Sequence, residues 1–277
     1  MTTKPFYWSV KREVWENRSV LIVPACAALL FLVAFALNLP AMASAAPNIR
    51  PYRMACFLLT MTSLLTGIFY SLDALHGERR DRSILFWKSM PVSDRTTILA
   101  KAFIPLILLP VVTLVAGFAA QIVMLLLSAG MLLASGGSAA SLGELPLLHQ
   151  WSEFVFGIAV LAVWQAPIHG WLLLVSGWAR RAVLLWAVLL PLAACLFERF
   201  AFGTDYLASL LLNRLTAGIV GDGIFAAGRL AGLSMMDKIV MLSPETLAAD
   251  PNLWFGLIPT AILLAGAIAS RRYRQPI

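Results

Sequence analysis

Six long apolar runs constrain this chain more than any other feature of its sequence. A helical run of about 20 apolar residues matches the roughly 30 Å hydrocarbon core of a bilayer. Only 13% of the 277 residues are charged, against about 25% in soluble domains. Because the runs are continuous rather than alternating, we predict an all-α, polytopic membrane protein with a single transmembrane domain over 1–277. Its six transmembrane helices are expected at 19–39, 54–75, 98–134, 153–178, 182–200 and 253–270.

The third run, 98–134, is too long for one crossing, because it would measure about 55 Å as a helix. No turn signal precedes Ser135-Gly136-Gly137, so we expect one helix that protrudes from the membrane. Most of the 21 Lys and Arg residues then fall before the first run, within 79–101, at 180–181 and at 271–274. By the positive-inside rule these segments, and both termini, are cytoplasmic. The basic residues therefore indicate orientation, and no nucleic-acid partner is expected.

Amphipathic stretches flank the spans. Residues 6–17 place Phe, Tyr, Trp and Val on one arc, with Arg12, Glu13 and Glu16 on the other. This pattern predicts an N-terminal interfacial helix on the cytoplasmic face. The outer segment 201–252 contains amphipathic stretches at 206–215 and 224–233, which we expect to form short outer helices.

The motifs of common enzymes are absent from the sequence. It has no His-Glu-x-x-His, Gly-x-Ser-x-Gly or Ser-x-x-Lys. Its three histidines lie in three separate segments, so we expect no metal site. The acidic residues of the spans, Asp73, Glu153 and Glu198, lie near the span ends, whereas ion-driven transport needs titratable groups at depth. We therefore expect no enzyme activity in this chain, and an energy source for any pumping outside it.

Three polar side chains are expected within the apolar runs. Gln121 lies in the third run, and Gln165 and His169 lie four residues apart in the fourth, beside a kink expected at Pro167. They are candidates for the lining of a substrate path. Hydrogen bonding between helices is an alternative role for them.

The inner loop 76–94 is the most informative segment. Pro91 ends a helix here and Ser93 is a candidate N-cap for the next one. The four bulky residues 84–87 point all round the helix axis, which favours burial against more than one partner. That partner is a second protein or the ends of the chain's own spans. The candidate docking residues are Glu78, Arg79, Asp81, Arg82, Phe86 and Trp87.

This loop resembles the coupling loop of type-two ABC exporter permeases. The resemblance rests on Glu78, Arg79, Arg82, Ser83, Trp87, Ser89, Pro91, Val92 and Ser93, with Lys101 opening the next span. It implies a cytoplasmic coupling helix that docks on a separate cytosolic ATP-binding subunit, which holds the ATP and magnesium, while this chain holds no cofactor. It also implies a dimer with a second copy or a related permease, in the inner membrane of a bacterium. The outer segment 201–252 is long for this family pattern.

The sequence thus predicts the permease subunit of an ATP-driven exporter of a hydrophobic or amphipathic substrate. A membrane scaffold or sensor that recruits a cytosolic protein through the loop is the first alternative. A membrane enzyme is the second.

Overall fold

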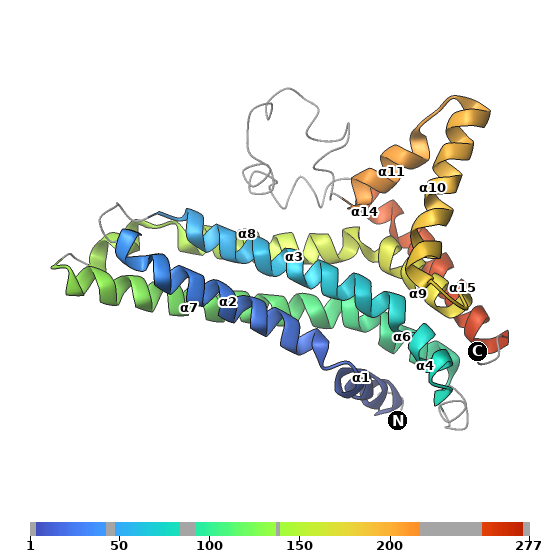
Figure 1. The fold of residues 1–277 in the computed structure, drawn as a ribbon, viewed down its shortest axis with the longest axis horizontal. Coiled ribbons are helices and arrows are strands. Elements are labelled where there is room, and N and C mark those ends of the chain that lie inside the picture. Colours follow the sequence, from blue (N-terminus) through green and yellow to red (C-terminus); the bar gives the residue numbers. More distant parts are fainter. Residues whose placement is uncertain (1–3, 43–47, 84–91, 137–138, 216–250, 274–277) are drawn as a thin grey trace. The chain divides into compact units, whose positions relative to one another are not determined.

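The computed structural model describes residues 4–42, 48–83, 92–136, 139–215 and 251–273, and these residues form helices and turns without any strand (Figure 1). Six of the helices are long and apolar enough to cross a membrane, which confirms the predicted number of spans. They cover Ser19–Pro40, Arg50–Arg80, Asp94–Ala134, Leu147–Trp164, Val183–Phe202 and Leu253–Tyr273. The predicted stretch 224–233 and the loop residues 84–91 lie outside the described residues.

The third span is one continuous helix, as expected from the missing turn signal. It runs through α6 (Asp94–Phe103), a π-helical turn η1 (Ile104–Leu108) and α7 (Leu109–Ala134). Its 41 residues correspond to about 60 Å, roughly twice the hydrocarbon thickness. The π turn contains Pro105 and is followed by Pro110 in the first turn of α7, and these two missing backbone N–H donors disfavour regular α-helical hydrogen bonding.

The fourth predicted span, 153–178, is divided into two helices. Helix α8 (Leu147–Trp164) ends before Gln165, and α9 (Ala166–Trp178) begins there with Pro167 in its first turn. The predicted kink is therefore a break. Only α8 is long enough by itself to count as a membrane-crossing helix. It begins before Glu153, since the helix continues through the polar residues that precede the apolar run.

The chain forms two compact units. Unit 1 contains Met1–Asn17, Gly67–Ile107 and Val160–Ile277, and unit 2 contains Arg18–Thr66 and Leu108–Ala159. Unit 1 includes α1 (Lys4–Glu16), α4 (His76–Arg80), α6, α9, α10 (Val183–Phe202), α11 (Tyr206–Leu215), α14 (Pro251–Phe255) and α15 (Leu257–Tyr273). Unit 2 includes α2 (Ser19–Met42), α7 and the 3-10 helix η2 (Ala139–Glu144). Helix α3 (Arg50–Asp73) and α8 contribute to both.

Small residues set the packing of α9 against α15 in unit 1. A Cβ atom on Gly170 would lie 3.3 Å from the Cβ of Leu263, and one on Gly266 would lie 3.2 Å from Leu174. The Ser270 hydroxyl donates a 3.0 Å hydrogen bond to the carbonyl of Gly177. Such close approach is typical of helix pairs in membranes, where van der Waals contact takes the place of hydrophobic driving force.

Unit 2 is built around the contact of α2 with α7. Phe35, Tyr52, Ala55 and Met124 are buried together at its centre. The exterior of the helices is strongly apolar instead. In α2, for example, Leu29, Leu30 and Leu37 are exposed, as lipid-facing side chains would be.

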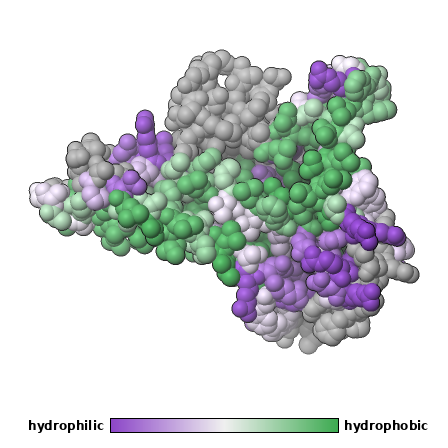
Figure 2. All heavy atoms as spheres, in the orientation of Figure 1, coloured by the Kyte–Doolittle hydropathy of each residue, from purple (hydrophilic) through white to green (hydrophobic). Residues whose placement is uncertain are grey.

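Hydrophilic side chains gather at one end of unit 1, over α1, α4 and the end of α15 (Figure 2). Apolar side chains cover the neighbouring helices in the same view. This is the end of unit 1 from which the loop 76–94 extends, and it contains the cluster described next.

Candidate functional site

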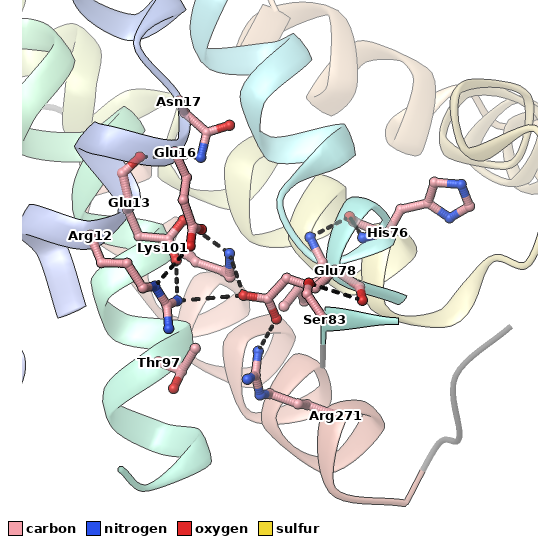
Figure 3. Close-up of polar contacts among 12 residues, drawn as sticks. Arg12, Glu13, Glu16, Asn17, His76, Glu78, Ser83, Thr97, Lys101 and Arg271 are labelled. Carbon is pink, nitrogen blue, oxygen red and sulfur yellow. Dashed lines mark hydrogen bonds and ion pairs between the residues drawn. The ribbon is translucent and has the colours of Figure 1, made fainter. Parts of the chain in front are cut away.

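A buried lysine in α6 forms the centre of a charged cluster (Figure 3). The Nζ atom of Lys101 lies 2.9 Å from Glu13 Oε2 of α1 and 3.1 Å from Glu78 Oε1 of α4. The three side chains are 2%, 0% and 6% exposed. One ammonium group therefore joins two carboxylates from helices that are far apart in the sequence.

A second cation, Arg271 in the last turn of α15, extends the cluster. Its Nη1 atom lies 2.6 Å from Glu78 Oε2, and its Nε atom lies 3.1 Å from Asp94 Oδ1. Asp94 is the first residue of α6, and the Ser93 hydroxyl caps this helix by accepting a hydrogen bond from the Thr96 amide. An acid at a helix N-terminus and a cation at a helix C-terminus both suit the helix dipoles.

Arg12 closes the cluster on the side of α1. Its Nη2 atom lies 2.5 Å from Glu13 Oε1 and 3.4 Å from Glu78 Oε1. The hydroxyl of Tyr70 in α3 donates a 3.0 Å hydrogen bond to Glu13 Oε2. Three carboxylates thus face three cations, and α1, α3, α4, α6 and α15 are held together at one point.

The pKa values of three ionisable side chains of α1 are shifted by burial and by their charged neighbours. Burial by itself would raise the pKa of the Glu13 carboxyl, but Lys101 and Arg12 more than offset it, so the pKa lies below its ordinary value. Burial acts to lower the pKa of Arg12, but the Glu13 carboxylate raises it above its ordinary value. Glu16 behaves oppositely to Glu13, because burial raises the pKa of its carboxyl and Arg12 only partly counters this. Glu13 is therefore held as a carboxylate inside the protein.

Such a cluster fixes geometry more than it adds stability. Removing charges from water costs several kcal/mol per ion, and this cost offsets much of the attraction within the cluster. Breaking one pair is nevertheless strongly unfavourable, because a buried charge is left uncompensated. The cluster can therefore act as a rigid joint among five helices, and we call it the charged joint.

The predicted docking residues fall into three groups. Glu78 and Arg79 are buried inside unit 1, whereas Asp81 and Arg82 are exposed. Phe86 and Trp87, also predicted to dock, lie outside the described residues. The backbone of Arg82 is left-handed, with φ of 57°, an uncommon conformation for a residue other than glycine. Docking by these residues stays a prediction.

Arg79 ties the start of the loop to α9. Its Nη1 atom donates to the carbonyl oxygens of Gly177 (2.8 Å) and Ala179 (3.2 Å), at the C-terminal end of α9. The Ser176 hydroxyl accepts hydrogen bonds from the amides of Leu75 (3.0 Å) and His76 (2.9 Å). The end of α9 is therefore bonded directly to the chain that enters the loop.

Two of the predicted path residues, Gln165 and His169, are buried in unit 1. His169 Nδ1 lies 3.0 Å from the Ser71 hydroxyl, which in turn lies 2.8 Å from the carbonyl oxygen of Gly67. The imidazole and the Ser71 hydroxyl therefore share one hydrogen bond, in which the tautomer of His169 decides which group donates. His169 thus joins α9 to α3, which is the interhelical role that the sequence left open.

Gln121, the third predicted path residue, is fully buried in unit 2. Its amide nitrogen donates to Cys56 Sγ (2.8 Å) and to the Tyr52 carbonyl (3.3 Å), and its oxygen accepts from the indole of Trp151. Both ends of the amide group are therefore occupied by neighbouring helices. A role of Gln121 in a substrate path stays a prediction.

The charged joint was not predicted from the sequence. Lys101 was noted for its fit to the loop motif, and Glu13 was placed on the polar arc of the predicted interfacial helix. A single lysine at the start of a long apolar run was the available signal, since such a charge needs a partner.

A search of known protein families, curated proteins and solved structures finds no match to this chain.

Proposed function

We propose that this chain is the transmembrane permease subunit of an ATP-driven exporter, acting with a separate cytosolic ATP-hydrolysing subunit and a second permease chain. The loop 76–94 is the coupling element, and the cargo is hydrophobic or amphipathic. The chain itself is not an enzyme. The charged joint at the base of the loop supports this proposal, together with the motif in the loop.

The observation that carries the proposal is the double contact of Arg271. This one guanidinium binds Glu78, just inside the start of the loop, and Asp94, at its end. Both ends of the loop are thereby fixed to α15. A loop that transmits a displacement from the ATP-binding subunit to the membrane helices needs such fixed ends. A freely hinged loop would absorb the displacement instead.

A displacement of the loop would reach the membrane helices by two routes. Through Arg79 and Ser176 it reaches the end of α9, and through Lys101 it reaches α6 and, by way of Glu13, α1. Rigid elements with discrete contacts are the means by which proteins carry displacement between distant sites. In this proposal the helices of the exporter rock as the ATP-binding subunits close and open.

Helix α1 is proposed to lie at the cytoplasmic membrane surface. Tyr7, Trp8 and Trp15 are more than half exposed, and Lys11 Nζ lies 4.9 Å and 4.8 Å from the ring centroids of Trp8 and Trp15. Aromatic and basic side chains together suit the headgroup layer. Helix α11 is the outer amphipathic helix, the termini are cytoplasmic, and the membrane is the inner membrane of a bacterium.

The test is co-purification of the ATP-hydrolysing subunit with loop variants. The double variant Arg82→Ala/Trp87→Ala should lower recovery of that subunit and substrate-stimulated ATP hydrolysis, while the membrane domain keeps its unfolding midpoint. The matched control is Arg180→Ala/Arg181→Ala. These two arginines are exposed beside α9, and their loss should leave recovery unchanged.

Three outcomes are informative. Retained recovery and full transport in the loop variant would defeat the proposal. Recruitment of a cytosolic protein without any ATP hydrolysis would instead identify the chain as a scaffold or sensor. Loss of turnover on replacement of a single His or acidic residue, with folding intact, would identify a membrane enzyme.

A further inference from the structure

Two buried polar atoms of unit 2 have no hydrogen-bond partner. Among the described residues of this unit they are Arg53 Nε, near the start of α3, and Gln150 Oε1, near the start of α8. Arg53 is partly buried, and Gln150 is only 4% exposed. Buried polar groups in native proteins are nearly always paired, and a cation within a membrane span needs a partner. A bound molecule that pairs with both atoms would satisfy this need.

The polar side chains around these two atoms are already paired within the protein. Both ends of the Gln121 amide group are occupied. The Glu153 carboxylate, near the start of α8, lies 3.1 Å from His149 Nε2. Among the described residues, no carboxylate forms an ion pair with Arg53. The Arg53 guanidinium therefore has room in its bonding for an anion from outside the chain.

The packing of α3 against α8 brings the two groups to the same level. Cys56 of α3 is buried with Phe154 and Ile158 of α8, and the Gln150 amide nitrogen lies 3.8 Å from Cys56 Sγ. Helices α3 and α8 run in the same direction (Figure 1). One turn nearer its start, α3 carries Arg53 on the face of Cys56. One turn nearer its own start, α8 carries Gln150 on the face of Phe154. The cation and the amide oxygen therefore lie at the end of unit 2 where both helices begin.

An apolar strip on the exposed side of α3 adjoins this pair. Met54 directly follows Arg53, Leu58 lies one turn further along the same face, and both are 39% exposed. A guanidinium suits a phosphate or carboxylate oxygen, and an amide oxygen accepts from a hydroxyl group. An acyl chain suits the apolar strip. The three features together match an amphipathic molecule with a polar head group that is anionic and hydroxylated.

We propose that Arg53 and Gln150 form a binding site for an amphipathic molecule whose head group carries a phosphate or carboxylate next to a hydroxyl group. Arg53 Nε donates to the anionic oxygen, and Gln150 Oε1 accepts from the hydroxyl group. The acyl chain lies along Met54 and Leu58. This inference does not depend on an ATP-driven partner. The molecule is a membrane lipid or a free amphipathic compound, and the experiment below distinguishes these two sources.

The experiment measures lipid affinity by native mass spectrometry of the full chain released from detergent micelles. Phosphatidylglycerol supplies a phosphate and hydroxyl groups, whereas phosphatidylmethanol supplies the same charge without a hydroxyl group. Arg53→Gln should weaken the binding of both lipids by about fivefold, and Arg53→Lys, which keeps the charge, should weaken it less. Gln150→Leu should weaken phosphatidylglycerol binding by about threefold, to the level of phosphatidylmethanol, whose own affinity should not change.

The source of the ligand is tested in nanodiscs by equilibrium dialysis with water-soluble hexanoyl-lysophosphatidylglycerol. Equal binding of this compound in nanodiscs of phosphatidylcholine and of phosphatidylglycerol would identify a free compound as the ligand. Binding that is lost in phosphatidylglycerol nanodiscs would identify the membrane lipid as the occupant of the site. Both results support the site.

Arg199→Gln is the matched control, since this arginine is 70% exposed on α10, and it should leave the affinity for both lipids unchanged. The unfolding midpoints of Arg53→Gln and Gln150→Leu should stay close to that of the unmodified chain, because Arg53 Nε and Gln150 Oε1 have no partner in the protein to lose. Equal lipid affinity in the unmodified chain and both variants would overturn the site and leave water as the partner of these atoms. Failure of both variants to fold would also overturn it, because the two side chains would then be structural supports.

Discussion

Replacing Lys101 by Met tests the charged joint most directly. The side chain keeps its length, and the ammonium group that contacts Glu13 at 2.9 Å and Glu78 at 3.1 Å is lost. Loss of one partner from a buried pair costs about 3–5 kcal/mol. Because Arg12 and Arg271 still contact the two carboxylates, we expect the lower end, about 3 kcal/mol.

The assay is equilibrium unfolding in mixed micelles, followed by the fluorescence of the nine tryptophans. The control is Arg80→Met. Arg80 pairs with Asp81 at 3.2 Å, but the two side chains are 61% and 65% exposed, so the control should change the unfolding free energy by less than about 1 kcal/mol. The difference between the two variants gives the effect on the unfolding free energy of removing a cation from a buried ion pair rather than from an exposed one.

A double variant then tests the cause of the loss. Lys101→Met/Glu13→Gln removes one cation and one carboxylate together, and it should be more stable than Lys101→Met alone by about 1 kcal/mol or more, because coupled neighbours are not additive. A loss of stability in Lys101→Met no larger than that in Arg80→Met would contradict the central role of the buried ammonium group. A further loss of stability on adding Glu13→Gln to Lys101→Met would contradict it equally.

The pKa of Glu13 is lowered on folding, so its ionised carboxylate stabilises the folded protein above about pH 4.3. This contribution to the free energy of unfolding is lost as the pH falls through the pKa of Glu13 in the folded protein. Glu13→Gln should therefore flatten the acid limb of a pH–stability curve. Gly170→Leu should lower the unfolding free energy by about 1–3 kcal/mol, since a Cβ there already lies 3.3 Å from Leu263, and Gly130→Leu, at a site with open space, serves as its control. Gln121→Leu should cost about 1–2 kcal/mol by leaving the Trp151 indole without its acceptor, whereas a transport defect at unchanged stability would favour a role in the substrate path.

The spans could be predicted because their signal is one of composition and length. Six helices meet that criterion in the described residues, and the long third helix follows from the absence of a turn signal. The boundaries were less accurate. The second span, helix α3, starts at Arg50 rather than at Met54. Polar residues can continue a helix beyond the apolar run where the interfacial region lets them reach water.

The charged joint could not be predicted from periodicity. A helical wheel separates polar from apolar side chains, and on α1 it assigned Glu13 to the solvent side. In the structure Glu13 is fully buried, while Trp8 and Trp15 are exposed. A helix that packs against both protein and lipid can turn an acid inward when cations from other helices meet it, and their positions depend on the tertiary fold.

The double contact of Arg271 also has a use in protein engineering. Glu78 and Asp94 both contact the guanidinium of Arg271, so the two ends of the intervening loop lie close together. Lengthening a closed connection adds only about 0.6 kcal/mol for each doubling. A foreign peptide, such as an epitope for antibody fragments used in electron microscopy, could therefore be inserted between Ser83 and Val92 with little strain on the helices beneath.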